Sequence, residues 1–211
     1  MKIIYKDGTT GECPQEQELH VIRHTAAHIL AQAVKNLYPQ AHFAYGPATE
    51  NGFYYDVDLG DVKLNDGDLA KIEAEMTKIV KANMPIKAFT LPRNEAIALM
   101  QERGEIYKVE HIGDLGEDEV ISFYQQGDYI DMCVGPHLCY TKALKAFKLT
   151  QVSGAYWKND RNNKMLTRIN GTAFATKDEL AAHMTALEEA RKRDHNKLGR
   201  ELEYFTTVDS I

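Results

Sequence analysis

The sequence predicts an α+β domain, in which helices pack on a mainly antiparallel sheet and a further helix follows at the C-terminus. Two observations support this class. Segments with a helical period and segments with strand-like alternation both occur, and they do not follow one another in the regular order of parallel βαβ units. The 211 residues, 44% of them hydrophobic, suffice for one large domain or for a domain with an appendage.

A short strand and a long helix open the chain. Residues 2–5 are strand-like and run into a Lys-Asp-Gly-Thr turn. The segment 19–37 contains neither Gly nor Pro and is stopped by Pro39, so we expect one helix there. Its apolar residues gather on one side, whereas His24 and His28 project from nearly the opposite side, one helical turn apart.

A hairpin and a second helix are expected next. Residues 42–45 and 53–57 are strand-like, and the second run is rich in aromatic residues. Gly-Pro and Asn-Gly turns between them favour a hairpin. Asn65 or Asp66 is expected to cap a helix with a regular apolar period that reaches about residue 82.

The second half of the chain is rich in strands. A strand at 86–91 and a helix at 92–103 are followed by an irregular connection over 105–119, which contains two glycines. Further strands are expected at 120–124, 129–132, 146–152, 154–157 and 165–175. A capping box at 176–179 opens a long helix to about residue 202, whose last part has little apolar face and which we expect to leave the domain.

Composition restricts the compartment and the class of protein. No apolar run approaches about 18 residues and the N-terminus lacks the pattern of an export signal, so we expect neither a membrane span nor secretion. Cys13, Cys133 and Cys139 are an odd number of cysteines, which argues against a disulfide framework and for the reducing cytoplasm. The net charge of −6, taken alone, speaks against a nucleic-acid partner.

The net charge hides a basic stretch. Residues 140–168 contain several basic side chains against the single acidic Asp160, and aromatic residues are interleaved with them. The basic residues are Lys142, Lys145, Lys148, Lys158, Arg161, Lys164 and Arg168. Such a stretch is typical of phosphate contacts supported by aromatic stacking, although a solvated basic edge would look the same.

The two histidines of the first helix are candidates for chemistry. At their spacing they can hold one small ligand between them. A solvated polar stripe is the simpler interpretation of His24 and His28, because this short pattern is common. Thr25 stands where a zinc peptidase of this spacing needs its catalytic Glu, which disfavours that class of enzyme.

A second motif, Asp131-Met-Cys133-Val-Gly135-Pro136-His137, lies at the end of a predicted strand. Gly135 permits an unusual backbone angle and Pro136 fixes the next one, so the loop can aim its cysteine and histidine at one point. With the two helical histidines, these groups suit zinc, and they suit hydrogen bonding and proton transfer around a water equally well. The simplest alternative is a turn capped by His137 beside a small buried Cys133.

Several spaced motifs occur in a characteristic order. They are His24-Thr-Ala-Ala-His28, Gly46-Pro47, Gly52-Phe-Tyr-Tyr55-Asp56, Tyr107-Lys108-Val109, Asp131-x-Cys133-x-Gly135-Pro136-His137, Ser153-Gly-Ala-Tyr-Trp157, Asn163-Lys-Met-Leu166 and Arg193-Asp-His-Asn-Lys-Leu-Gly199. This set resembles the editing domain of bacterial threonyl-tRNA synthetases. The resemblance covers residues from about 15 to about 203, and the ordered context makes it far more specific than any single motif.

The resemblance implies a division of the chain. Residues 1–14 would form a short strand and turn in place of a ubiquitin-like domain, and residues 15–176 would form the editing domain. Residues 177–203 would be a linker helix toward a catalytic domain, and residues 204–211 a tail. We expect no class II catalytic domain in this chain, so ATP and the catalytic zinc of the parent enzyme would not be housed here.

The implied function is proofreading. Threonine and serine differ by one methyl group, which permits a discrimination of only about 10- to 200-fold by binding. A second, hydrolytic site that admits serine and excludes threonine would correct the error by cutting the ester of seryl-tRNA(Thr). The implied partner is the acceptor end of tRNA(Thr) carrying serine. The parent would be a cytoplasmic homodimer that attaches threonine using ATP, and the fragment would be a monomer.

The resemblance also assigns the site residue by residue. The residues expected to line the hydrolytic pocket are His24, His28, Lys108, Asp131, Cys133 and His137, and those expected to seat the substrate are Tyr55, Gly135 and Pro136. A water held by the histidines and Cys133 would attack the ester, Lys108 would stabilise the oxyanion, and Asp131 would orient the substrate amine. No metal or other cofactor is expected in this chain, and zinc at the three histidines and the cysteine is the alternative. A tRNA-binding module without hydrolysis and a zinc-dependent hydrolase of small esters are competing interpretations.

Overall fold

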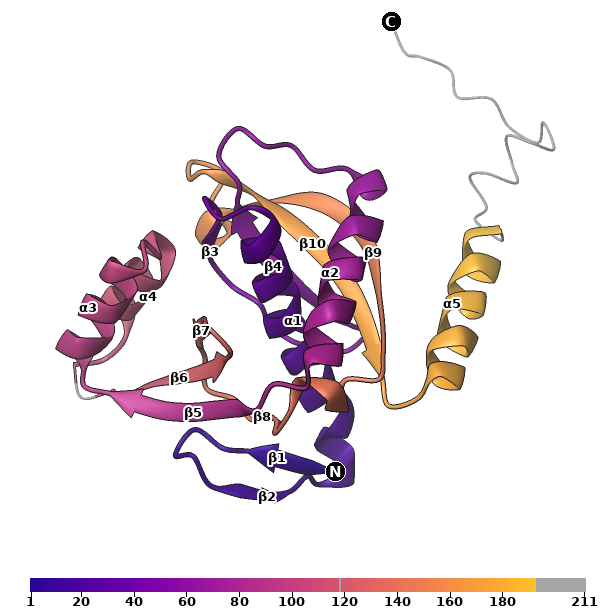
Figure 1. The fold of residues 1–211 in the computed structure, drawn as a ribbon. Helices are drawn as coiled ribbons and strands as arrows, with labels where there is room; N and C mark the ends of the chain where they lie inside the picture. The colour runs from indigo at the N-terminus through magenta and orange to yellow at the C-terminus, as the bar shows by residue number, and fades with distance from the viewer. Residues whose placement is uncertain (118, 193–211) are drawn as a thin grey trace, which may run out of the picture.

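Antiparallel strands arranged in three small sheets surround one long helix (Figure 1). The computed structural model describes residues 1–117 and 119–192. The helices are α1 (Glu18–Leu37), α2 (Leu69–Ala82), α3 (Arg93–Glu102), α4 (Ile106–Asp114) and α5 (Lys177–Lys192). The strands are β1 (Lys2–Ile4), β2 (Thr10–Glu12), β3 (His42–Phe43), β4 (Phe53–Asp58), β5 (Ile86–Leu91), β6 (Ile121–Gln126), β7 (Tyr129–Met132), β8 (His137–Leu138), β9 (Ala146–Tyr156) and β10 (Met165–Phe174).

Helix α1 lies at the centre of the main hydrophobic core. It is buried from Val21 to Val34, on all sides. Its apolar side packs with residues of β4 and β10, the two inner strands of the sheet β3-β4-β10-β9, and helix α2 lies beside it (Figure 1). Burial of a single Ile or Leu side chain stabilises a fold by about 1.5 to 3 kcal/mol, so this helix is firmly anchored.

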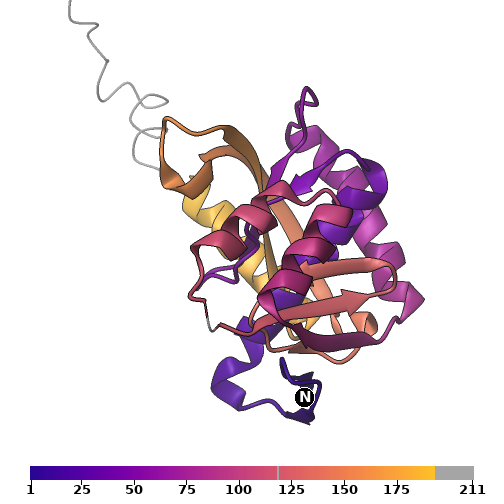
Figure 2. The same cartoon turned by 90° about the vertical axis from the view of Figure 1, so that its left-hand side faces the viewer.

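The histidine side of α1 is covered by elements that come much later in the sequence. Strand β8 lies against α1 and pairs with β1, so the N-terminal hairpin β1-β2 is part of this cover. The sheet β5-β6-β7 contributes β7, which carries Asp131 to the helix. Helices α3 and α4 share a second hydrophobic cluster with β6 and face the viewer in Figure 2. This packing fixes α4 and therefore the position of Lys108.

The predicted α+β class is confirmed, and most predicted elements are present. Strands β3 and β4 pair as the expected hairpin. The side chain of Asn65 accepts a hydrogen bond from the Gly67 N–H at 2.8 Å, as expected for a cap. Thr176 and Glu179 exchange backbone and side-chain hydrogen bonds of 3.0 and 3.2 Å, which is the predicted capping box.

Two predictions from the sequence are wrong. The segment 105–119 contains helix α4 rather than only an irregular connection, because Gly113 falls in the last turn, where it interrupts little, and Tyr107, Lys108 and Ile112 are buried. The solvated stripe proposed for the histidines of α1 is also wrong, since His24 is 8% and His28 3% exposed.

The remaining predictions concern the ends of the chain and the membrane. The end of the linker helix and the tail, residues 193–211, lie outside the described residues, and the proposed domain boundaries stay predictions. Within residues 1–117 and 119–192, none of the helices combines the length and the apolar character that crossing a membrane requires.

Candidate active site

The side chains predicted for the site meet beside the middle of α1. His24 and His28 come from α1, Tyr55 from β4, Lys108 from α4, Asp131 from β7, Cys133 from the loop after β7, and His137 from β8. All except the partly buried Cys133 are at most 8% exposed. Sequence motifs more than a hundred residues apart are thus brought into one buried cluster.

Four of these residues, His24, His28, Cys133 and His137, form a compact group that we call the quartet. One potential ligand atom from each lies within 4.8 Å of the others. The Cys133 Sγ is 3.1 Å from His137 Nε2, and the His137 ring centroid is 4.2 and 4.1 Å from those of His24 and His28. His24 Nδ1 is buried and has no hydrogen-bond partner among the described residues, so this nitrogen is free to bind a water or a substrate.

Thr25 holds one member of the quartet in place. Its Oγ1 accepts the backbone N–H of Leu138 at 3.0 Å and lies 3.2 Å from His137 Nδ1. Because the second contact fixes the ring through the nitrogen that does not face Cys133, it governs which nitrogen carries the proton. In the sequence, Thr25 serves only to disfavour a zinc peptidase. Its position between the two histidines of the motif is the one feature that could have pointed to this role.

Asp131 is the centre of a second, charged network. Its Oδ1 is 2.7 Å from the Lys108 Nζ, and its Oδ2 accepts the hydroxyl of Tyr55 at 2.6 Å and that of Tyr129 at 3.3 Å. The same Oδ2 lies 3.5 Å from His28 Nε2, which joins the network to the quartet. Lys108 also donates to the Tyr55 hydroxyl at 3.0 Å. Tyr129 is not among the residues predicted for the site, because in the sequence it only follows the alternation of β7.

Burial controls the protonation of the histidines. It lowers the pKa of His24 to about 3, with a further contribution from His28, and it lowers the pKa of His28 to about 4 against the pull of Asp131. The pKa of His137 lies well below its ordinary value for the same first reason. All three imidazoles are therefore neutral at pH 7 and able to accept a proton or to bind a metal.

The pKa values of the Asp131 carboxyl and the Cys133 thiol are shifted in opposite directions. Burial acts to raise the pKa of Asp131, but the charge of Lys108 and the hydrogen bonds from Lys108 and Tyr55 outweigh it, so the pKa lies below the ordinary value. Burial raises the pKa of Cys133, and the nearby Asp131 charge adds to this. The cluster thus contains a carboxylate, an ammonium and a neutral thiol.

The loop that carries Cys133 has the backbone freedom that its sequence predicted. Gly135 has a φ of +63°, and a Cβ atom at this position would collide with the Tyr124 hydroxyl. Pro136 follows in the same turn and leads into β8. The Tyr124 hydroxyl is buried without a hydrogen-bond partner among the described residues, and the Tyr124 ring lies 4.4 Å from that of His137. Gly135 and Pro136 therefore shape the wall of the cluster.

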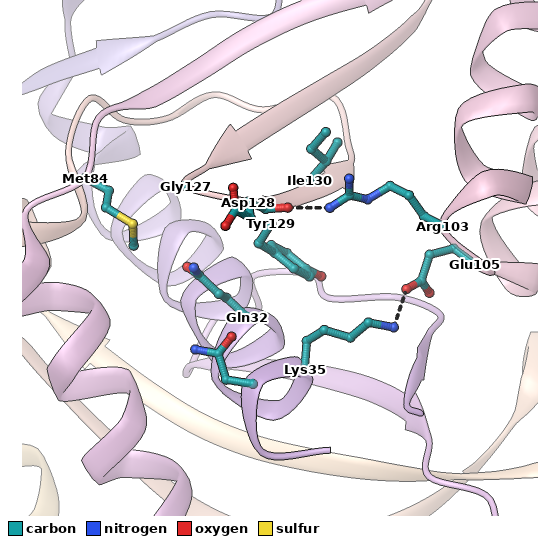
Figure 3. A pocket seen from close by; sticks show the side chains of 10 residues that line it. Gln32, Lys35, Met84, Arg103, Glu105, Gly127, Asp128, Tyr129 and Ile130 are labelled. Carbon is teal, nitrogen blue, oxygen red and sulfur yellow. Dashed lines mark hydrogen bonds and ion pairs between the residues drawn. The ribbon is translucent and has the colours of Figure 1, made fainter. Parts of the chain in front are cut away.

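A cavity of about 540 Å³ lies on the other side of Tyr129 (Figure 3). Its lining includes the ion pair between Lys35 and Glu105 at 3.1 Å and a hydrogen bond from Arg103 to the carbonyl of Asp128. Tyr129 is the one residue that this cavity shares with the Asp131 network. None of the quartet lines the cavity, so its size is not evidence about the site itself.

The basic stretch 140–168 is largely neutralised by ion pairs. Lys148 pairs with Glu73, Lys158 with Glu110 and Asp114, Lys164 with Asp58, and Arg168 with Asp56, at 2.6 to 2.9 Å. The other basic residues predicted to contact tRNA are exposed, and they are Lys142, Lys145 and Arg161. Lys142 and Lys145 line a cavity next to α5, whereas Lys158 and Arg168 line another cavity.

The quartet fits a zinc ion by residue type, since histidine and cysteine are its usual ligands. The unpartnered Nδ1 of His24 supports this fit. In a tetrahedral site with bonds of about 2.0 to 2.3 Å, ligand atoms lie about 3.3 to 3.7 Å apart. The ligand atoms of the quartet lie within 4.8 Å of one another, so a small adjustment of the side chains would bring them to such distances.

Comparisons with known proteins agree with the geometry. Residues 121–170 match the family described as the threonyl and alanyl tRNA synthetase second additional domain. The chain is 61% identical over 185 residues to the threonine-tRNA ligase of Clostridioides difficile (strain 630), which covers 88% of this chain and 29% of that protein. It is 54% identical over 211 residues to the threonine-tRNA ligase of Clostridium perfringens (strain SM101 / Type A), covering 99% and 32%.

A third relative shows the same pattern. The threonine-tRNA ligase of Acetivibrio thermocellus is 59% identical over 183 residues, which cover 87% of this chain and 29% of that protein. The chain thus spans about 30% of the length of the relatives that it matches. The matched domain begins in β6 and ends within β10, inside the segment that these relatives share with the chain. Over about nine tenths of its length or more, the chain is therefore similar to about 30% of the length of bacterial threonine-tRNA ligases, in a segment that includes the match to the second additional domain.

Proposed function

We propose that this chain is a hydrolase that cleaves the ester between a wrongly attached serine and the 3′ end of tRNA(Thr), as the editing part of a threonine-tRNA ligase. The observation that carries the proposal is the meeting of the quartet with the Lys108–Asp131 pair in one buried cluster. Buried polar groups cost free energy unless they are paired, so a purely structural core would not gather so many of them.

The reaction adds water across the ester. A water bound at the free Nδ1 of His24 attacks the carbonyl carbon and passes a proton to a neutral imidazole. His28 is the best placed, because the Asp131 carboxylate 3.5 Å away stabilises the imidazolium that forms. The carbon–oxygen bond to the ribose then breaks, and the imidazolium gives its proton to the leaving ribose oxygen, which restores the neutral imidazole.

Lys108 supplies the positive charge for the oxyanion. Its ammonium is fixed by Asp131 and by the Tyr55 hydroxyl at 2.7 and 3.0 Å, so it needs little reorganisation when negative charge develops. From the sequence, Asp131 is expected to orient the substrate amine. Since its two oxygens already contact Lys108, Tyr55, Tyr129 and His28, we propose instead that Asp131 positions Lys108 and stabilises His28.

Zinc is the alternative source of electrophilic assistance. When bound by His24, His28, Cys133 and His137, the ion would act as a Lewis acid and lower the pKa of a coordinated water. In that case Thr25 would fix the ring of His137 from its second nitrogen. We propose that the reaction proceeds without the ion, because the neutral imidazoles and the Lys108 ammonium can supply the base and the electrophilic assistance.

The test is deacylation of serine-charged tRNA(Thr) by the chain, with threonine-charged tRNA(Thr) and a chelator in parallel reactions. We expect selective release of serine that the chelator does not change. The variant His24→Ala should lose this activity while its far-ultraviolet circular dichroism and melting temperature remain close to those of the parent chain. His20→Ala, a substitution of the exposed histidine one turn earlier on α1, is the matched control and should retain the activity.

Each outcome has a definite consequence. Equal release of serine and threonine would contradict an editing function, and loss of activity with chelator would replace the metal-free mechanism by the zinc-dependent one. If the chain binds tRNA and releases no serine while a full-length relative does, hydrolysis requires other domains. If neither releases serine, the chain is a tRNA-binding module.

A further inference from the structure

A second concave site lies on the sheet β3-β4-β10-β9 and is separate from the quartet. It is a cavity of about 390 Å³, which we call the outer pocket. Its lining is Tyr45, Tyr54, Asp56, Gly154, Ala155, Tyr156, Trp157, Lys158, Asn159 and Arg168. The volume is at the lower end of small-ligand pockets, of the order of one nucleoside.

The walls of the outer pocket are flat and rigid. The rings of Tyr45 and Trp157 stack with centroids 5.0 Å apart, and each is held at its edge, Tyr45 through His111 at 3.1 Å and Trp157 through Glu110 at 3.1 Å. Elsewhere in the pocket a charged group provides a second flat surface, because the Arg168 guanidinium lies 3.8 Å from the centroid of the Tyr54 ring. Aromatic rings and guanidinium planes are the surfaces on which nucleobases stack.

The charges in the outer pocket are already compensated. Arg168 makes two hydrogen bonds to Asp56, at 2.7 and 2.8 Å, and Lys158 pairs with Glu110 and Asp114. A phosphate would have to compete with these carboxylates. A neutral planar ring would not, so the pocket favours a base over the backbone of a nucleic acid.

The backbone at the rim is held in an unusual conformation. Lys158 and Asn159 are consecutive non-glycine residues with positive φ, at +53° and +56°. They are fixed by a bond from the Asn163 side chain to the Trp157 carbonyl at 3.0 Å. Such conformations cost about 1 to 3 kcal/mol each and persist where the surroundings impose them, often at ligand sites.

The outer pocket adjoins the candidate active site through neighbouring residues. Tyr54 lines the pocket, whereas the next residue, Tyr55, points to the other face of β4 and contacts Asp131. Tyr107 contacts the Trp157 ring at a centroid distance of 4.9 Å, and the next residue is Lys108. Two residues of the candidate active site, Tyr55 and Lys108, are thus directly next in sequence to residues that line the pocket or contact its wall.

From these observations we propose that the outer pocket binds a nucleobase of the single-stranded 3′ end of the RNA, upstream of the nucleotide whose ester is cleaved. The proposal rests on the proposed function and names a second contact of the same substrate. It also gives a reason for Tyr156 at the rim, whose side chain is 45% exposed although it is large and aromatic.

The test measures binding of RNA without hydrolysis. A short, unacylated single-stranded RNA that ends in cytidine-cytidine-adenosine is titrated into the chain, and the fluorescence of Trp157, the only tryptophan of the sequence, is followed. The same RNA is then used with one base at a time removed to leave the bare sugar. Removal of the base that occupies the pocket should weaken binding about 5- to 150-fold, the range for loss of one stacked base.

Two variants connect this effect to the pocket. Ala155→Phe fills the pocket, and Tyr156→Ala removes a ring from its rim. Both should weaken binding of the complete RNA and make it less sensitive to the missing base, as expected for partners in a double-mutant cycle. Tyr140→Ala, which removes a tyrosine that is 51% exposed and lies outside the pocket, is the control and should bind like the parent chain.

The result that would overturn the proposal is equal binding of complete and base-free RNAs by the parent chain. Equal binding of the complete RNA by the parent chain and by Ala155→Phe would overturn it too. That result is also the one expected if the pocket contacts another protein instead of RNA. Measuring RNA binding and serine release side by side separates this proposal from the proposed function. If base-dependent binding is present and no serine is released by the parent chain or by a full-length relative, only the proposed function fails. If serine is released without base-dependent binding, only the outer pocket fails.

Discussion

Strand β4 separates two regions that contain similar residue types and differ in how far their side chains are exposed. Tyr55 points inward to Asp131 and Lys108, where side chains are at most 6% exposed and bond to one another. Tyr54 points outward to Arg168, whose side chain is 32% exposed. The inner region therefore couples chemistry to stability, because no charge there can be removed without leaving another one buried. The outer region can change with little effect on folding.

The largest effect is expected from breaking the inner ion pair. Asp131→Asn leaves the Lys108 ammonium buried without its counter-charge, which should reduce the free energy of unfolding by about 3 to 5 kcal/mol. The outer equivalent, Asp56→Asn, should cost about 1 to 2 kcal/mol, because water reaches Arg168. Urea unfolding followed by circular dichroism measures both.

A double variant sharpens this comparison. Lys108→Met with Asp131→Asn removes both inner charges and should be more stable than Asp131→Asn alone, while remaining inactive in deacylation. If Asp131→Asn and Asp56→Asn cost the same, the difference in burial does not govern the two regions as we describe.

The second largest effect concerns pH. His24 and His28 have pKa values of about 3 and 4 in the folded chain, against about 6.5 when unfolded. Below pH 6.5 the unfolded chain takes up protons that the folded chain does not. The free energy of unfolding therefore decreases as the pH is lowered from about 6.5 to about 4. Each histidine contributes up to about 1.4 kcal/mol per pH unit. Asp131 adds nothing in this window, because both its folded and its ordinary pKa lie below it.

Denaturant midpoints measured with chelator from pH 7.5 to 4.5 check this dependence. His24→Gln should make it less steep. His111→Gln is the comparison near the outer pocket, where burial lowers the pKa of a histidine that is only partly buried, and its effect should be smaller. A stability that does not change with pH would show that the quartet is more solvated than its burial indicates.

The same contrast shows how far sequence reasoning reaches. The helix from Glu18 to Leu37 and the strand from Ile86 to Leu91 follow from local periodicity and from stop signals, which act within the segment itself. The inner site residues were found through motifs and a family resemblance. Their meeting depends on β7 and β8 packing on α1, which is information that no local pattern contains.

The errors and omissions have the same origin. Helix α4 was missed because its short stretch forms a buried face only when α3 and β6 are beside it. The ion pairs of the basic stretch could not be read from the sequence, because acidic partners such as Glu73 and Asp58 are far away along the chain. Thr25 gained a role only once Leu138 and His137 were placed next to it. Each case is a tertiary contact that overrides or neutralises a local signal.

A smaller effect is expected from the two neighbouring tyrosines. Tyr55→Phe removes the hydroxyl that donates to Asp131 and accepts from Lys108, which should cost about 1 to 3 kcal/mol and slow deacylation. Tyr54→Phe keeps the ring under Arg168 and should change stability by less than about 0.5 kcal/mol. Melting temperatures and initial rates of serine release measure the difference, and equal effects would contradict the two-sided arrangement of β4.

The smallest effect concerns the paired lysines of the basic stretch. Lys148 is 48% exposed and bonds to Glu73 at 2.9 Å, so Lys148→Ala should change stability by about 0 to 1 kcal/mol. Because Lys148 must leave Glu73 to bind a phosphate, its loss should not alter the salt dependence of tRNA binding. Lys145→Ala, a substitution at an exposed lysine beside Lys142 in the cavity next to α5, should reduce the slope of log K against log salt by about 0.7 to 0.9 if it contacts a phosphate. A reduced slope for Lys148→Ala instead would mean that the outer ion pairs open on binding and that the charge of this stretch is available to RNA after all.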